Sequence, residues 1–152
     1  MEDSKWQVEA ERLKEIKPKG FLFLCVANSA RSQLGEGVAR MLAPQGVRVQ
    51  SAGSKPTSVR PEAVTVMKEI GIDPSAQFSK NVEDIHPATV DVVITLCAEE
   101  ECPLFLGKAE RIHWGLPDPA SVKGSDEERL EAFRATRDEL RKRLSVVFGQ
   151  II

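Results

Sequence analysis

The residues best suited to chemistry in this 152-residue chain are a cysteine and an arginine separated by five residues. Cys25 follows an apolar run typical of a buried strand, and Arg31 precedes a run with helical spacing. A loop in this position can curl around a tetrahedral oxyanion, with its backbone N–H groups and the positive end of the following helix directed at the anion. The same field favours a nucleophilic thiolate, and an arginine can hold two oxygens in a bidentate fork.

Each position of this loop has a predicted role. Cys25 is the candidate nucleophile, Arg31 the candidate anion clamp, and Ser32 is placed to donate to the sulfur. Asn28 suits a residue that needs a positive φ and a side-chain brace. The competing interpretation is a buried strand-end cysteine followed by a helix-start arginine, which the strand–loop–helix context disfavours. The predicted oxyanion-binding residues are Val26, Ala27, Asn28, Ser29, Ala30 and Arg31.

Two further cysteines, Cys97 and Cys102, lie close together in the sequence. The charged N-terminus is unlike a signal peptide and no apolar run is long enough to span a membrane, so we expect a cytoplasmic protein. In that compartment paired cysteines are more often redox-active than structural, although two small core residues remain the alternative. A metal site is disfavoured because His86 and His113, the only histidines, lack metal-site spacing to the cysteines.

The elements that would position these residues alternate between strands and helices. The glycines at positions 35 and 37 weaken one helix by about 1 kcal/mol each, which close packing against a neighbour would offset. Pro61 suits a helix start, Gly71 a helix end, and Ser125 with Glu128 a capping box. The predicted strands cover residues 21–26, 47–52, 91–96 and 111–114, and the predicted helices cover 5–17, 32–43, 61–70 and 125–147.

This order predicts an α/β fold, a single domain with a four-stranded parallel sheet and helices on both faces. We expect residues 1–19 to be a helical N-terminal extension and residues 20–152 to be the domain. Ligands of open sheets bind at the carboxyl ends of the strands, so Cys25, Cys97 and Asp118 should meet at one edge. The net charge of -2 gives no reason to expect a nucleic-acid or membrane partner, and we expect a monomer.

Several motifs of the chain resemble one known family. The loop, with Gln33-x-x-Glu36, Ser51-Ala52-Gly53 and Asp118-Pro119, resembles the low-molecular-weight protein tyrosine phosphatase superfamily, over about residues 20–148. Thr95-Leu96-Cys97, Cys102-Pro103, His113-Trp114-Gly115 and Asp118-Pro119-Ala120 resemble its thioredoxin-coupled arsenate reductase branch. The chain differs from that branch in a shorter spacing between Cys97 and Cys102, and in Ala30, where a cysteine is often found.

The resemblance implies a reaction. Cys25 attacks arsenate to form a thiol–arsenate adduct, and Asp118 protonates the departing oxygen. Cys97 attacks the Cys25 sulfur, arsenite leaves, and Cys102 then attacks Cys97 and frees Cys25. Thioredoxin is the implied partner that reduces the Cys97–Cys102 disulfide, no other cofactor is implied, and phosphate or sulfate would act as analogues of arsenate.

Movement and cation binding add two expectations. A disulfide needs Cα atoms about 4.4–6.8 Å apart, and residues five apart on a helix rise about 7.5 Å. Cys97 and Cys102 must therefore lie in a loop, or their segment must unwind on oxidation, and residues 97–106 are predicted to be mobile. Some relatives bind potassium beside the loop through positions that correspond to Asn28, Glu36, Ser51 and Lys80. Here the Lys80 ammonium is hypothesised to replace that ion and to brace Asn28 and Glu36; an ordinary surface lysine is the alternative.

Two other functions remain open. A tyrosine phosphatase would use the same loop and Asp118, but it needs an aromatic-walled slot for a phenol ring. Ala120 follows the Asp-Pro pair, the chain has no tyrosine, and aromatic residues make up 5%. These features favour a small inorganic substrate, and we expect the protein to keep a weak phosphatase activity. A non-enzymatic oxyanion-binding or redox-sensing module would need neither Asp118 nor the distal cysteine pair.

Overall fold

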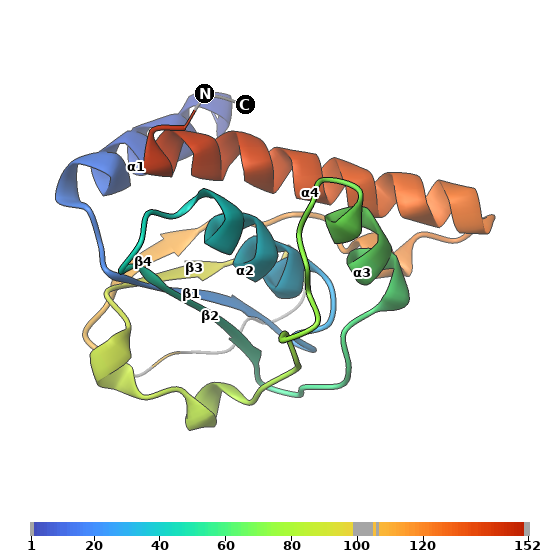
Figure 1. The fold of residues 1–152 in the computed structure, drawn as a ribbon, viewed down its shortest axis with the longest axis horizontal. Helices are drawn as coiled ribbons and strands as arrows, with labels where there is room; N and C mark the ends of the chain where they lie inside the picture. The colour runs from blue at the N-terminus through green and yellow to red at the C-terminus, as the bar shows by residue number, and fades with distance from the viewer. Residues whose placement is uncertain (1, 99–104, 106, 151–152) are drawn as a thin grey trace.

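The computed structural model describes residues 2–98, 105 and 107–150 (Figure 1). Four parallel strands form one sheet in the order β2-β1-β3-β4, and β1 is buried along its whole length. Each strand lies within one residue of its predicted bounds at both ends. The strands are β1 (Gly20–Cys25), β2 (Arg48–Gly53), β3 (Val92–Thr95) and β4 (Glu110–His113).

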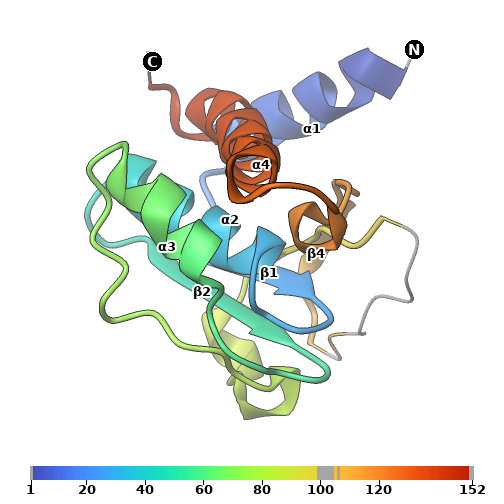
Figure 2. The ribbon, with the colours of Figure 1, turned by 90° about the vertical axis from the view of Figure 1, so that its right-hand side faces the viewer.

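The α-helices of the described residues pack on one face of this sheet (Figures 1 and 2). Side chains alternate along each strand, so Phe21 and Phe23 of β1 point into the core under these helices. Helix α4 runs along α1, α2 and α3 and holds them together. The helices are α1 (Glu2–Ile16), α2 (Arg31–Leu42), α3 (Pro61–Lys68) and α4 (Asp126–Phe148).

The opposite face carries a second, smaller core. Leu22 and Leu24 of β1 and Val93 of β3 pack there against Ile85 and Phe105. Two short 3-10 helices, η1 (Val82–Asp84) and η2 (Pro87–Thr89), lie in the segment that supplies Ile85. Helices therefore cover both faces, as the alternation predicted, but unequally: the α-helices take one face and single 3-10 turns take the other.

Helix α2 owes its close approach to the sheet to glycine. A Cβ at Gly35 would lie 2.8 Å from the Phe23 ring, and one at Gly37 would lie 2.5 Å from the Met67 sulfur. Both distances are shorter than a real Cβ contact, so a larger residue would force a neighbour to move; the buried Phe23 ring has less freedom to do so than the flexible Met67 side chain. The close packing expected at these two glycines is confirmed.

The two ends of the chain meet in the helical layer. Helix α1 buries Trp6, Ala10 and Leu13 in the same core cluster as α4, so the N-terminal segment is part of the main core. The capping box of Ser125 and Glu128 at the start of α4 is confirmed by both of its hydrogen bonds. No helix in the described part of the chain is long and apolar enough to cross a membrane.

Candidate active site

All four strands end at one edge of the sheet, because they are parallel. Cys25 is the last residue of β1 and pairs with Gly53 at the end of β2. Beyond the end of β3, the Leu96 N–H donates to the Leu24 carbonyl (2.9 Å), so the chain remains beside β1 up to the residue before Cys97. The sheet thus brings the two cysteines to neighbouring strand ends.

The loop between β1 and α2 turns its carbonyl groups outward. Three of them accept backbone N–H groups of the segment after β2, and a fourth, that of Asn28, accepts the Ser79 hydroxyl (2.7 Å). The three backbone pairs are Lys55 N to Val26 O (2.9 Å), Thr57 N to Ala27 O (3.0 Å) and Arg60 N to Ser29 O (2.9 Å).

The outward carbonyls determine where the N–H groups of the loop point. In a trans peptide the C=O and the next N–H point in opposite directions, so the N–H groups that follow these carbonyls are turned to the inside of the loop. Helix α2 begins there at Arg31, and no side chain caps its first turn at the N-cap residue Ala30. The inward-facing N–H groups and the positive end of the helix together make a concavity suited to an anion.

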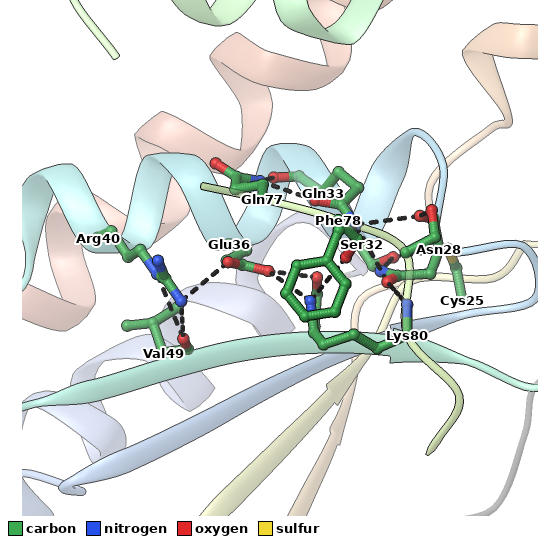
Figure 3. Close-up of polar contacts among 12 residues, drawn as sticks. Cys25, Asn28, Ser32, Gln33, Glu36, Arg40, Val49, Gln77, Phe78 and Lys80 are labelled. Carbon is green, nitrogen blue, oxygen red and sulfur yellow. Dashed lines mark hydrogen bonds and ion pairs between the residues drawn. The ribbon is translucent and has the colours of Figure 1, made fainter. Parts of the chain in front are cut away.

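Cys25 is the free thiol at the start of this loop, and only 3% of it is exposed. Its Sγ lies 2.8 Å from the Ser32 Oγ, and the Asn28 side-chain amide donates to the same oxygen at 2.7 Å (Figure 3). A serine hydroxyl has one hydrogen to donate, and with the Asn28 amide as a donor to its oxygen, that hydrogen can be directed at the sulfur. In general, a hydroxyl that donates to a cysteine sulfur stabilises the thiolate, which is the nucleophilic form of cysteine.

Arg31 is anchored at the edge where the strands end. Its Nη1 donates to the Leu116 carbonyl (2.9 Å) and, at 3.4 Å, to the Leu96 carbonyl. These carbonyls belong to the residues that follow β4 and β3, so the strand ends set the position of the guanidinium. The side chain is 4% exposed, which places its positive charge inside the protein next to the loop.

Asn28 is the centre of a polar cluster that holds the loop. Its φ of 48° confirms the positive φ expected at this position. The Asn28 Oδ1 accepts from the Gln33 side chain (3.0 Å) and from the Lys80 backbone N–H (2.9 Å). Gln33 also donates to the Phe78 carbonyl (3.0 Å) and accepts from Gln77 (2.8 Å), which ties the segment before η1 to the loop (Figure 3).

Next to this cluster lies a buried carboxylate with three partners. Glu36, 1% exposed, accepts the Ser51 hydroxyl at 2.5 Å and pairs with Arg40 at 3.0 Å and with the Lys80 ammonium at 3.6 Å. The ammonium also donates to the Phe78 carbonyl at 2.8 Å. Burial lowers the pKa of Lys80 from its ordinary value of 10.5, and the Glu36 carboxylate acts in the opposite direction.

The four residues of the proposed cation position therefore lie together, with one difference from the hypothesis. The Lys80 ammonium reaches Glu36, whereas Asn28 is reached by the backbone N–H of Lys80. Lys80 is not an ordinary surface lysine, since its side chain is 18% exposed and lies over the Phe78 ring, 4.4 Å from the centroid. Within the described residues, no three histidine, cysteine, aspartate or glutamate side chains form a group that could hold a metal ion.

The structure describes the remaining predicted site residues, Cys97, Cys102 and Asp118, only in part. Cys97 is 1% exposed and follows β3. Asp118 caps the 3-10 helix η3 (Pro119–Ser121), and its Oδ1 accepts the Ala120 N–H at 3.0 Å. Cys102 and most of the segment 97–106 lie outside the described residues. The mobility of that segment therefore stays a prediction.

Gln77 and Phe78 are supporting residues that the sequence did not single out. Gln77 holds the side chain and the carbonyl of Gln33, and the Phe78 carbonyl accepts from both Gln33 and Lys80. Neither belongs to a motif or to a periodic element, so no local pattern indicates them. Their nearness to the loop in space depends on how the long connection from α3 to β3 folds back.

Residues 20–151 match the low molecular weight phosphotyrosine protein phosphatase family. The arsenate reductase of Halalkalibacterium halodurans is 44% identical over 131 residues, which cover 85% of this chain and 94% of that protein. A solved arsenate reductase in the phosphate-binding state is 34% identical, with a TM-score of 0.73 over 86% of this chain and 97% of that one. The thioredoxin-dependent arsenate reductase of Corynebacterium glutamicum is 27% identical, with a TM-score of 0.58 over 97% of this chain and 73% of that one.

Proposed function

Since the chain belongs to the low molecular weight phosphotyrosine protein phosphatase family, and within it to the arsenate reductases, we propose that it reduces arsenate to arsenite by a cascade of three cysteines. The observation that carries the proposal is the loop around Cys25, with its carbonyls turned outward and its N–H groups turned inward. Arsenate is a tetrahedral oxyanion, so it fits the same arrangement of donors as phosphate.

The first step is the attack of Cys25 on arsenic. The Cys25 sulfur forms a bond to arsenic, and one oxygen leaves as water after Asp118 gives it a proton. Arg31 and the loop N–H groups hold the other oxygens and offset the negative charge. Ser32 stabilises the thiolate before attack through its 2.8 Å contact with Cys25.

The second step transfers two electrons to arsenic. The Cys97 thiolate attacks the Cys25 sulfur, an S–S bond forms, and the S–As bond breaks with its electron pair remaining on arsenic. Arsenic(V) becomes arsenic(III), and two thiols become one disulfide. This step is supported by the place of Cys97, which follows β3 beside the end of β1, where Cys25 lies.

The third step regenerates the nucleophile. Cys102 attacks Cys97, a Cys97–Cys102 disulfide forms, and Cys25 is released as a thiolate. The dithiol of thioredoxin then reduces this disulfide, a role supported by the thioredoxin-dependent relative from Corynebacterium glutamicum. The cascade needs reduced thiols between turnovers, so we propose that the enzyme works in the cytoplasm.

A coupled assay tests this function directly. The protein is incubated with arsenate, thioredoxin, thioredoxin reductase and NADPH, and both NADPH oxidation and arsenite are measured. We expect one NADPH consumed for each arsenite formed, and slow hydrolysis of p-nitrophenyl phosphate by the same loop. Phosphatase activity without arsenite would favour a tyrosine phosphatase, and phosphate binding without either activity would favour a non-enzymatic oxyanion-binding module.

The cluster of Asn28, Glu36, Ser51 and Lys80 leads us to propose that the Lys80 ammonium is a built-in cation that stabilises the loop. We therefore expect the melting temperature and kcat/KM of the wild-type protein to be the same in potassium chloride and in sodium chloride. In Lys80→Asp the position loses its cation and gains an oxygen ligand. We expect potassium to raise the melting temperature of this variant by about 3 °C relative to sodium.

Lys108→Asp provides the matched control, because it makes the same substitution at an exposed lysine. Its melting temperature should respond to the two salts as that of the wild type does. A melting temperature of the wild type that rises with potassium but not with sodium would contradict the proposal that Lys80 is a built-in cation. The same melting temperature for Lys80→Asp in both salts would contradict it as well.

A further inference from the structure

Both tryptophans of the chain lie where helix α1 meets the rest of the molecule. Trp6 belongs to α1, and Trp114 follows β4 directly; both are buried. The guanidinium of Arg143 on α4 lies over both rings, with its Cζ 5.3 Å from the Trp6 centroid and 5.5 Å from the Trp114 centroid. Such cation–π contacts fix α1, α4 and the residue after β4 relative to one another.

Glu9 connects α1 to Trp114 by a hydrogen bond. The indole Nε1 of Trp114 donates to the Glu9 carboxylate at 3.1 Å, between residues that are 105 positions apart in the sequence. Trp114 is 2% exposed, and a buried indole N–H needs a partner. Helix α1 supplies this partner, although it lies outside the residues that match the family.

The residues that follow Trp114 lead into the active site. The Leu116 N–H donates to the Leu96 carbonyl (3.1 Å), and the Leu116 carbonyl accepts from Arg31 (2.9 Å). Gly115 lies between Trp114 and Leu116. It approaches the chain that follows β3 so closely that a Cβ on Gly115 would lie 3.0 Å from the Cys97 carbonyl. The three-residue segment 114–116 therefore touches α1 at its start and Arg31 at its end.

We propose that α1 is a positioning element of the oxyanion site, and that Glu9 acts through Trp114 and the Leu116 carbonyl on the guanidinium of Arg31. The inference rests on the proposed function only in naming arsenate as the substrate. A shift of segment 114–116 moves the carbonyl that anchors Arg31, and small displacements of an anion clamp are costly. The thioredoxin-dependent relative from Corynebacterium glutamicum, matched over 97% of this chain, takes in most of α1 as well.

The proposal predicts a loss of oxyanion affinity in Glu9→Ala. We expect the Kd for inorganic phosphate, measured by calorimetry, to rise about tenfold, because Arg31 loses its fixed position. The KM for arsenate should rise by a similar factor, whereas kcat should change little. Glu9→Gln keeps an oxygen acceptor for Trp114 and should bind phosphate as the wild type does.

Glu11→Ala is the matched control, since it removes an exposed carboxylate from the same helix. A role in stability alone would lower the melting temperature of Glu9→Ala and leave its phosphate Kd equal to that of Glu11→Ala; that result would overturn the proposal.

A second variant separates the hydrogen bond from general loosening. Trp114→Phe keeps a ring and removes the N–H, so it should also raise the phosphate Kd. The phosphate Kd of the double variant Glu9→Ala/Trp114→Phe should equal that of the weaker-binding single variant, because both changes remove the same hydrogen bond. Multiplicative effects would refute coupling through this bond. Phosphate binding is measured without turnover, so failure of arsenate reduction in the wild type would leave this test valid.

Discussion

Replacing Cys25 with serine is expected to stop arsenate reduction, with a loss of at least about 10⁴-fold in kcat/KM. The serine hydroxyl is a far weaker nucleophile than a thiolate, and its oxygen cannot enter the disulfide that reduces arsenic. The hydrolysis of p-nitrophenyl phosphate should be lost as well, because both reactions begin at the same atom.

Phosphate binding shows whether the site survives this substitution. The loop N–H groups and Arg31 do not depend on the sulfur, so the phosphate Kd of Cys25→Ser should remain within about threefold of the wild-type value. The circular dichroism spectrum should be unchanged. Arsenite production by a folded Cys25→Ser protein, at a rate near that of the wild type, would contradict the assignment of the nucleophile.

Replacing Cys97 with serine is expected to abolish arsenite production and to preserve phosphatase activity. In this variant Cys25 can still form the adduct, but no second thiol at the end of β3 can attack the Cys25 sulfur and release arsenite. Hydrolysis of p-nitrophenyl phosphate needs only the loop and Asp118, so its rate should remain within about threefold. The loss of arsenite turnover should be at least about 10³-fold.

Cys102→Ser is the matched variant, because it also replaces a sulfur with an oxygen, but at the cysteine that acts one step later in the cascade. It should release one arsenite per protein and then stop, because the Cys25–Cys97 disulfide forms and nothing resolves it. Mass spectrometry after alkylation should show that disulfide in Cys102→Ser and not in Cys97→Ser. Sustained arsenite production by either variant, or loss of phosphatase activity in folded Cys97→Ser, would contradict this division of roles.

The order of the elements and the place of the loop between β1 and α2 could be predicted from the sequence. Each depends on residues that are close together along the chain: the spacing from Cys25 to Arg31, the alternating apolar runs and the capping box at Ser125. Such features are local because side-chain periodicity and helix capping act within a few residues. The positive φ of Asn28 belongs to the same class, since it reflects what one side chain tolerates.

The contacts that hold the loop were decided only by the tertiary structure. Gln77 reaches Gln33 and Glu9 reaches Trp114, each across a sequence separation that no periodic pattern describes. The contact of Lys80 with Glu36 was expected from the family resemblance, but no pattern in the chain itself indicates it. The same holds for the unequal covering of the two sheet faces. These features depend on strand order, on the register of β1 with its neighbours and on the close packing of α2. Burial then requires each polar group to take the partner that the fold has brought near, whatever its place in the chain.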